Sequence, residues 1–367
     1  MTKSLNLTKT FMEQKQKDER ALRSIRLLDK LRKHPVLGFA VFALILVVVK
    51  LMADAGAVNA GLVNAIGSTI IYCIVGLGFC LLLGYSALAS LGTAGFIAIG
   101  CYSTYYCIAE WGLTIGVSLL MSVGLAIVIG IAVGYISLRI EGIYLAIVTL
   151  GVAQIIKEAL SAIMDTIKIN KYKLTFMNID GLLIDPDAMF YILVAVLFIL
   201  MLLTSNLMNS PTGRAMLAMK NSTSAAQAFG ISLMKYRLMA FVLSTIYAAI
   251  AGMLFMLYVG YVSNSSSTLF SLSTSLNILG AVIIGGTKSI WGTLGGTFII
   301  YGINSMFLQD IAFFRDNPTL ITIVCGLLVV LVVMFFPGGL VQLVWTLILK
   351  IKGLFKKWRV RRYGLEE

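Results

Sequence analysis

The sequence predicts an all-α polytopic membrane protein of about ten transmembrane helices. Three observations predict this class: hydrophobic residues make up 59% of the chain, charged residues only 12%, and the mean hydropathy is +0.95. A soluble globular protein has fewer apolar and more charged residues. Several uncharged runs reach or approach the ~20 residues that a helix needs to cross a bilayer. None of them shows the alternating pattern of a membrane β-strand.

Apolar segments follow one another through residues 36–340, which we interpret as the membrane domain. "GAVIIGGTKSIWGTLGGTF" at 280–298 is rich in glycine, so this part is expected to form either a hairpin of two tilted helices or one broken helix. The ten segments are expected near 36–53, 59–83, 88–108, 113–135, 143–163, 188–207, 238–260, 276–287, 291–308 and 318–336.

The basic residues are concentrated at the two ends of the chain. Residues 1–35 are expected to form a cytoplasmic tail or an amphipathic helix on an anionic membrane surface, and residues 341–367 a second cytoplasmic tail. With ten spans that start inside, most of the 29 Lys and Arg residues fall in cytoplasmic segments, as the positive-inside rule requires. The net charge of +13 therefore indicates topology rather than nucleic-acid binding.

The segment between the sixth and seventh spans, residues 208–237, is polar and basic and contains no acid. It includes "AMKNSTSAAQAFGISLMKY" at 218–236, which is rich in small, helix-forming residues and shows no large apolar face. The charge pattern places this segment in the cytoplasm. On physical grounds alone it is either an ordinary solvated loop or a docking surface.

Residues that could supply energy or chemistry are scarce. The one histidine, His34, lies outside the predicted spans, and Lys50, Lys157 and Glu158 lie near span ends, so proton coupling is disfavoured. Sodium coupling stays open, because carbonyl and hydroxyl groups can bind sodium. No Gly-Lys dipeptide occurs, so there is no P-loop. We expect no catalytic residues, no metal site and no cofactor, and the five cysteines lie in apolar stretches where they act as small hydrophobes.

Several stretches carry a family resemblance, and their shared order through about residues 60–340 makes it specific. They are "SLGTAGFIAIGCY" (90–102), "LRIEGIYLAIVTLGVAQII" (138–156), "SPTGRAMLAMKNSTSAAQAFGISLMKYRLMAFVLS" (210–244), "ILGAVIIGGTKSIWGTLGGT" (278–297) and "GLLVVLVVMFFPGGL" (326–340). In these stretches the chain resembles the permease subunits of bacterial ABC importers for branched-chain amino acids, and among the two permeases of such systems it looks like the M-type one.

The resemblance implies a cytoplasmic coupling helix that seats in a cleft of an ATPase subunit. The matching segment here is 211–236, in which Gly230 is expected to end a helix with a positive φ. Family members often have glutamates where this chain has Thr223 and Gln227, which weakens the case for a salt bridge to the ATPase there. The residues expected to serve this coupling are Arg214, Lys220, Ala225, Ala226, Gln227, Phe229 and Gly230.

A translocation pathway is expected beside "SLGTAGF", with Ser90 and Thr93 as polar groups. Gln154 and Asn277 are further intramembrane candidates, although each of the four could equally form an interhelical hydrogen bond. Many relatives have a histidine where this chain has Thr93. The outer segment 164–187 is expected to be either a face for a solute-binding protein or a plain solvated loop.

The resemblance also implies the partners and the location. They are a second permease subunit, two ATP-binding subunits that use the ATP, an extracytoplasmic solute-binding protein and the lipid bilayer of a bacterial cytoplasmic membrane. The implied cargo is a branched-chain or other small amino acid. Urea, short amides or nucleosides are alternative cargoes for such a permease, and a sodium-coupled secondary carrier is the alternative mechanism.

Overall fold

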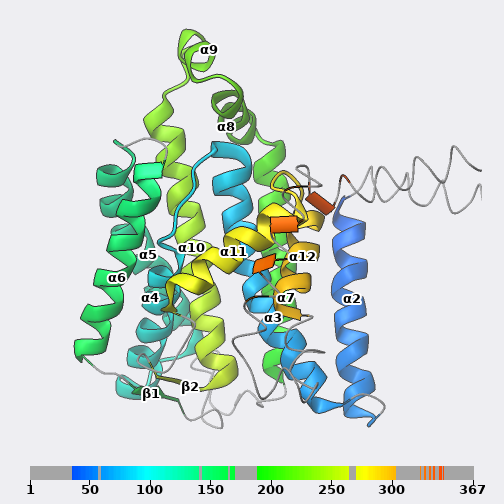
Figure 1. The fold of residues 1–367 in the computed structure, drawn as a ribbon. Coiled ribbons are helices and arrows are strands. Elements are labelled where there is room, and N and C mark those ends of the chain that lie inside the picture. The colour runs from blue at the N-terminus through cyan, green and yellow to red at the C-terminus, as the bar shows by residue number, and fades with distance from the viewer. Residues whose placement is uncertain are drawn as a thin grey trace, which may run out of the picture.

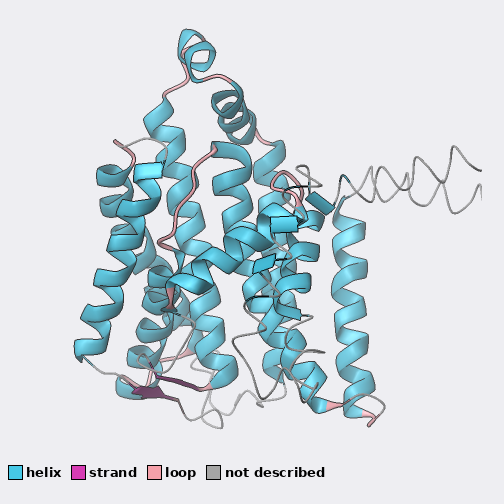
Figure 2. Cartoon of the chain, viewed as in Figure 1, coloured by secondary structure: helices cyan, strands magenta, loops and turns pink. Residues whose placement is uncertain are grey.

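The computed structural model describes residues 35–302 apart from gaps at 57–58, 140–142, 164–165, 170–187 and 264–269, together with scattered positions between 323 and 342. Within these residues the chain is a bundle of long helices that run side by side (Figure 1), and almost all of its regular structure is helical (Figure 2). Almost all of the two predicted tails and most of the tenth predicted span lie outside the described residues.

Six of the described helices are long and apolar enough to cross a membrane. Lys50 lies near the end of the first one, one turn before Asp54, and pairs with Asp54 at 2.6 Å, as expected for a charged residue near a span end. The six are α2 (Pro35–Asp54), α3 (Ala60–Phe79, which continues as the π-helical turn η1, Cys80–Tyr85), α5 (Ile115–Ser137), α6 (Ile143–Ile163), α7 (Met189–Asn209) and α10 (Leu233–Val259).

Three predicted spans differ in their bounds from the helices that the structure describes. The span predicted at 88–108 is wrong at its start, because residues 87–92 are not helical and α4 begins at Thr93. α4 runs to Tyr105 and continues as the π-helical turn η2 (Tyr106–Glu110). In the glycine-rich part the hairpin alternative is the observed one: α11 (Leu272–Gly285) and α12 (Ile290–Thr297) pack together, and α12 continues as η6 (Phe298–Gly302).

The turn between α11 and α12 has a local cause. Gly286 has a φ of +110°, a backbone conformation that L side chains rarely adopt. Ser289 then caps α12, because its side chain accepts a hydrogen bond from the Gly292 amide. The count of ten spans stays a prediction, since only the six long helices meet the length and composition of a span within the described residues.

The core of the bundle forms around α10, which packs against α3, α4 and α5. Its closest neighbour is α4, and glycines make this approach possible. A Cβ atom on Gly100 would overlap the carbonyl oxygen of Ala249, and one on Gly252 would overlap the carbonyl oxygen of Ile97. Small residues of this kind let membrane helices pack closely, where no hydrophobic driving force acts between them.

The two ends of the bundle differ. At one end β1 (Thr166–Lys168) and β2 (Tyr261–Ser263) form a two-stranded antiparallel sheet in which Ile167 lies opposite Val262, a small exception to the all-α prediction. At the other end α8 (Pro211–Asn221) and α9 (Thr223–Ala228) project beyond the long helices (Figure 1). Which of these ends faces the cytoplasm stays a prediction.

Candidate functional site

The projecting pair of helices, α8 and α9, is defined by local sequence signals. Ser210 caps α8 by accepting from the Gly213 amide at 3.2 Å, and proline follows it at the first helical position. Ser222 caps α9 in the same way through the Ala225 amide. These caps fix where each helix starts, so the chain turns sharply between them.

Gly230 ends α9, as the sequence predicts. Its φ is +77°, its amide donates to the Gln227 carbonyl at 2.9 Å, and the Ile231 amide donates to the Ala226 carbonyl at 3.0 Å. This pair of bonds is a Schellman motif, in which the left-handed residue is most often glycine. The turn directs the chain back toward α10.

The helix pair has an apolar face that the sequence analysis missed. Met216 and Met219 are buried, as is Ala226, and α8 packs against α7, α10 and the end of α3. Isolated methionines and an alanine gave no clear stripe in so polar a sequence. Because Ala226 is only 3% exposed, a charged residue placed there would disturb the packing of α9 as well as any docking surface.

The outward surface of the pair carries most of the predicted coupling residues. Arg214, Ala225, Gln227 and Gly230 are exposed. Phe229 is 85% exposed, the largest value among the exposed large hydrophobic residues of the described chain. An exposed aromatic side chain at the tip of a short, capped helix is typical of an interface residue. Aromatic side chains are enriched among the residues that contribute most of the binding energy of an interface.

Lys220 differs from the other predicted coupling residues, because its ammonium group bonds within the chain. It donates to the carbonyl oxygens of Leu83 at 3.1 Å and Gly84 at 2.8 Å, at the C-terminal end of η1. A cation at a helix C-terminus satisfies carbonyls that have no helical partner. Burial, and then the nearby Lys288, lowers the pKa of Lys220. Lys220 therefore joins the projecting pair to the end of α3.

The non-helical segment 87–92 follows directly from that end of α3 and enters the bundle. Backbone amides at membrane depth need partners, and hydroxyl side chains supply them. The Leu91 amide donates to Thr149 Oγ1 at 3.0 Å, the Gly92 amide to Ser90 Oγ at 3.2 Å, and the Ala94 amide to Ser275 Oγ at 3.1 Å. α6 and α11 thus hold the break in place from two sides.

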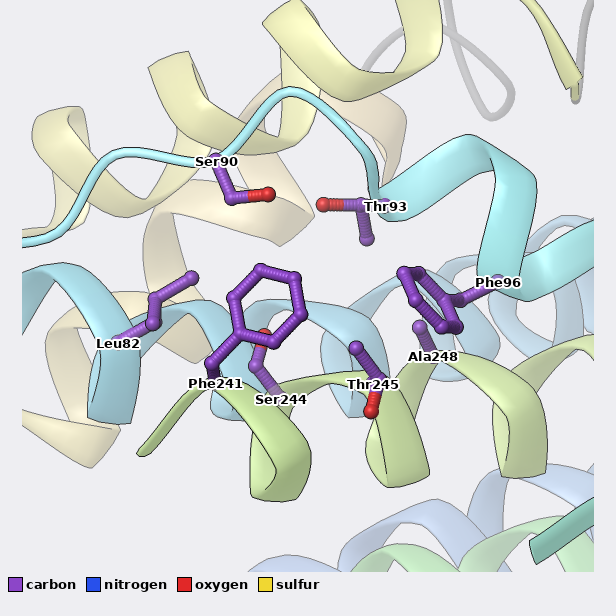
Figure 3. A pocket seen from close by; sticks show the side chains of 8 residues that line it. All are labelled: Leu82, Ser90, Thr93, Phe96, Phe241, Ser244, Thr245 and Ala248. Atoms are coloured by element: carbon purple, nitrogen blue, oxygen red, sulfur yellow. The ribbon is translucent and has the colours of Figure 1, made fainter. Parts of the chain in front are cut away.

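A small cavity lies beside this break (Figure 3). Its volume is about 10 Å³, close to the least that one water molecule needs. In Figure 3 the hydroxyl groups of Ser90 and Thr93 point toward each other across the cavity. Both residues are buried. The cavity is lined by Leu82, Ser90, Thr93, Phe96, Phe241, Ser244, Thr245 and Ala248.

The structure brings together two of the four predicted pathway residues. Ser90 and Thr93 line the cavity, whereas Gln154 lies on the outward face of α6 and Asn277 is half-buried on α11. Ser244, which lines the cavity from α10, was not predicted from the sequence, and neither were the two hydroxyl residues of α6 and α11 that hold the break. Serines and threonines are common in apolar helices, so nothing in the sequence singled these out.

A helical bundle that spans a membrane, with one span broken beside a small cavity that holds hydroxyl groups and with a helix pair projecting outside, has the architecture of a membrane transport protein. The comparison with known families gives the particular group. Residues 61–333 match the family described as "Branched-chain amino acid transport system / permease component", and the chain belongs to this family of transport permeases. Together with the six long apolar helices, this makes it a multi-pass inner-membrane protein.

Individual relatives agree with the family. The chain is 30% identical over 312 residues to the high-affinity branched-chain amino acid transport system permease protein LivM of Escherichia coli (strain K12), covering 78% of this chain and 71% of that protein. It is equally similar to LivM of Salmonella typhimurium. The autoinducer 2 import system permease protein LsrC of Enterobacter sp. (strain 638) is 28% identical over 116 residues, 31% of this chain and 34% of that protein. No solved structure matches.

Proposed function

We propose that this chain is the M-type membrane subunit of an ABC importer that takes up branched-chain or other small amino acids. A second permease subunit completes the pathway, two ATP-binding subunits drive it, and an extracytoplasmic binding protein delivers the cargo. ATP is bound and hydrolysed by the partner subunits. In this proposal the end of the bundle that carries α8 and α9 faces the cytoplasm.

The exposed tip of α9 is the observation that carries the proposal. Phe229 is 85% exposed on a helix that is capped at both ends and packs mainly against α8. Such an element can transmit a conformational change from an ATP-binding subunit only if that subunit contacts it. Phe229 is the side chain best placed to become buried in that contact. Lys220 connects a movement of the helix pair to the bundle. It bonds the end of α3, from which the chain continues into the broken segment.

The proposed cargo is supported by the relatives, of which the LivM proteins are described as parts of a branched-chain amino acid transport system. The cavity beside the break is consistent with a closed pathway, since its volume of about 10 Å³ can hold no more than one water molecule. Opening must then move α4 away from α10 or repack Phe96 and Phe241, whose rings lie 6.2 Å apart.

The test uses the complete complex, co-expressed from the genes of all its subunits. Retention of the ATP-binding subunits is measured by affinity purification. Leucine uptake is measured in proteoliposomes that contain ATP, with the binding protein added outside. Phe229→Glu should lower ATPase retention about tenfold or more, because it removes an aromatic anchor and adds a charge. Trp111→Glu is the matched control, since Trp111 is also exposed, at 57%, but lies after η2, away from α9.

Two results would contradict the proposal. Uptake that needs a sodium gradient and no ATP would point to a secondary carrier. Equal ATPase retention by wild type and Phe229→Glu would show that α9 is not the docking element. Uptake of urea or a nucleoside in place of leucine, isoleucine and valine would keep the importer and replace its cargo.

A further inference from the structure

The outward face of α6 departs from the pattern of the other membrane helices. α6 lies at the edge of the bundle (Figure 1) and contacts α4 and α5. It is the least buried of the six long helices: 6% of its most apolar stretch is buried, against 83% for α3. Most side chains of α6 are therefore at least partly exposed on the outside of the bundle.

Two other outer helices show what a lipid-facing surface looks like in this chain. On α5 all three serines and two of the glycines are buried against the bundle, among them Ser118, Ser122 and Gly130. Its exposed residues are large and apolar, such as Leu120 at 73% and Val128 at 67%. The exposed face of α2 is likewise built from valine, leucine, isoleucine and methionine up to its last turn. Lipid tails favour such faces.

On α6 the distribution is different. Helical spacing places Gly151, Gln154, Glu158 and Ala162 on one stripe, and the last three of these are exposed. A Cβ atom on Gly151 would meet no other atom, so none of the described residues of this chain packs against the space that its missing side chain leaves. Small residues and polar side chains together are the composition of a helix–helix interface inside a membrane.

The polar pair lies between the middle and the end of the span. Gln154 is near the middle of the 21-residue helix, and its Nε2 donates to Glu158 Oε1 at 2.8 Å, one turn further along. This bond turns the carboxylate back toward the helix centre and away from the nearer membrane surface. Lys157 beside it is partly buried against the bundle. A carboxylate in this position is costly in lipid and is normally matched by a partner group.

We propose that this face of α6 packs against a transmembrane helix of a different membrane subunit, which places a hydrogen-bond donor or a cation opposite Glu158. The inference rests on the proposed function, in which a second permease accompanies this chain. A second copy of the same chain fits less well. Two copies related by a twofold axis along the membrane normal would bring equal depths together and set Glu158 beside Glu158, which like charges oppose.

The test is photo-crosslinking in membranes that contain the complete complex. Benzoylphenylalanine is introduced separately at Ile155 on α6, Leu120 on α5 and Val48 on α2, all exposed positions at 69%, 73% and 42%. Irradiation is followed by mass spectrometry of the adducts. The Ile155 position should give an adduct with the second permease subunit, and the other two positions little or none.

A second variant tests the polar pair. Glu158→Leu should lower recovery of the second permease with this chain about tenfold or more, as expected for removing one partner of a buried charged contact. Leu120→Ala is the control and should leave recovery unchanged. Because Glu158 is exposed in the isolated chain, the leucine variant keeps the packing of the bundle.

The outcomes separate this inference from the proposed function. An adduct from Ile155 to another copy of this chain, or adducts only from the α2 or α5 positions, would overturn the inference. So would recovery of the second permease with no adduct from Ile155, and the proposed importer would then still stand. Failure to recover any second permease with the wild-type chain would refute the partner itself, and the inference would fall with it.

Discussion

Replacing Gly230 by alanine tests the turn that holds α9 in place. Gly230 has a φ of +77° and no atom near its missing Cβ, so the change is purely conformational. A non-glycine residue in the left-handed region costs roughly 1–2 kcal/mol. The Schellman bonds to Gln227 and Ala226 depend on that conformation. α9 should therefore open more often, while the buried bundle keeps its stability.

Hydrogen exchange measured by mass spectrometry checks this directly. A loss of 1–2 kcal/mol raises the open population, and with it the exchange of the α9 amides, by about 5–30-fold. Gly230→Asn should show a smaller increase, because asparagine tolerates the left-handed region better than alanine. Gly124→Ala, at an ordinary and open helical site of α5, is the control. Unchanged exchange in Gly230→Ala would refute the reasoning, and so would equal acceleration throughout the bundle.

Three further changes should lower the apparent melting temperature in detergent. Gly100→Ala places a methyl group against the backbone of α10 and should cost about 1–3 kcal/mol or more. Lys220→Met removes the donor at the end of α3 and should cost about 1–3 kcal/mol, which Lys220→Arg should partly restore. Thr149→Val leaves the Leu91 amide without its acceptor and should also cost about 1–3 kcal/mol.

Each of these has a distinct contradicting result. An unchanged melting temperature in Gly100→Ala would mean that α4 and α10 do not approach as closely as described. A Lys220→Met variant that melts at the wild-type temperature would show that the ammonium bonds contribute nothing. If Thr149→Val and Thr149→Ser were alike, the hydroxyl group would not be what satisfies the break.

Sequence patterns predicted the long helices well, because a span is a local property. About twenty consecutive apolar residues predict a transmembrane helix, however the rest of the chain is arranged. The glycine that ends α9 was equally readable, since a left-handed C-terminal residue is selected by its own backbone. The buried position of Ala226 was not readable, because it depends on how α9 folds back on α8.

The break before α4 shows a second limit. "SLGTAGF" carries the small and polar residues of an interruption, and the sequence analysis marked Ser90 and Thr93 but still drew one continuous span through the region. Thr149 and Ser275, far away along the chain, stabilise this break, because they accept hydrogen bonds from the Leu91 amide before α4 and from the Ala94 amide in its first turn. No local pattern can report a partner at that separation.

By itself, the sequence determined that this protein lives in a membrane as a helical bundle, where most of its spans lie, and which family it resembles. Those properties depend on composition and on order along the chain. The tertiary structure decided that Lys220 bonds the end of α3, that Phe229 stands exposed, that two hydroxyls face one cavity, and that Gln154 faces outward. Each of these depends on which helix lies beside which, and in a membrane that choice is made by close packing and hydrogen bonds between distant residues.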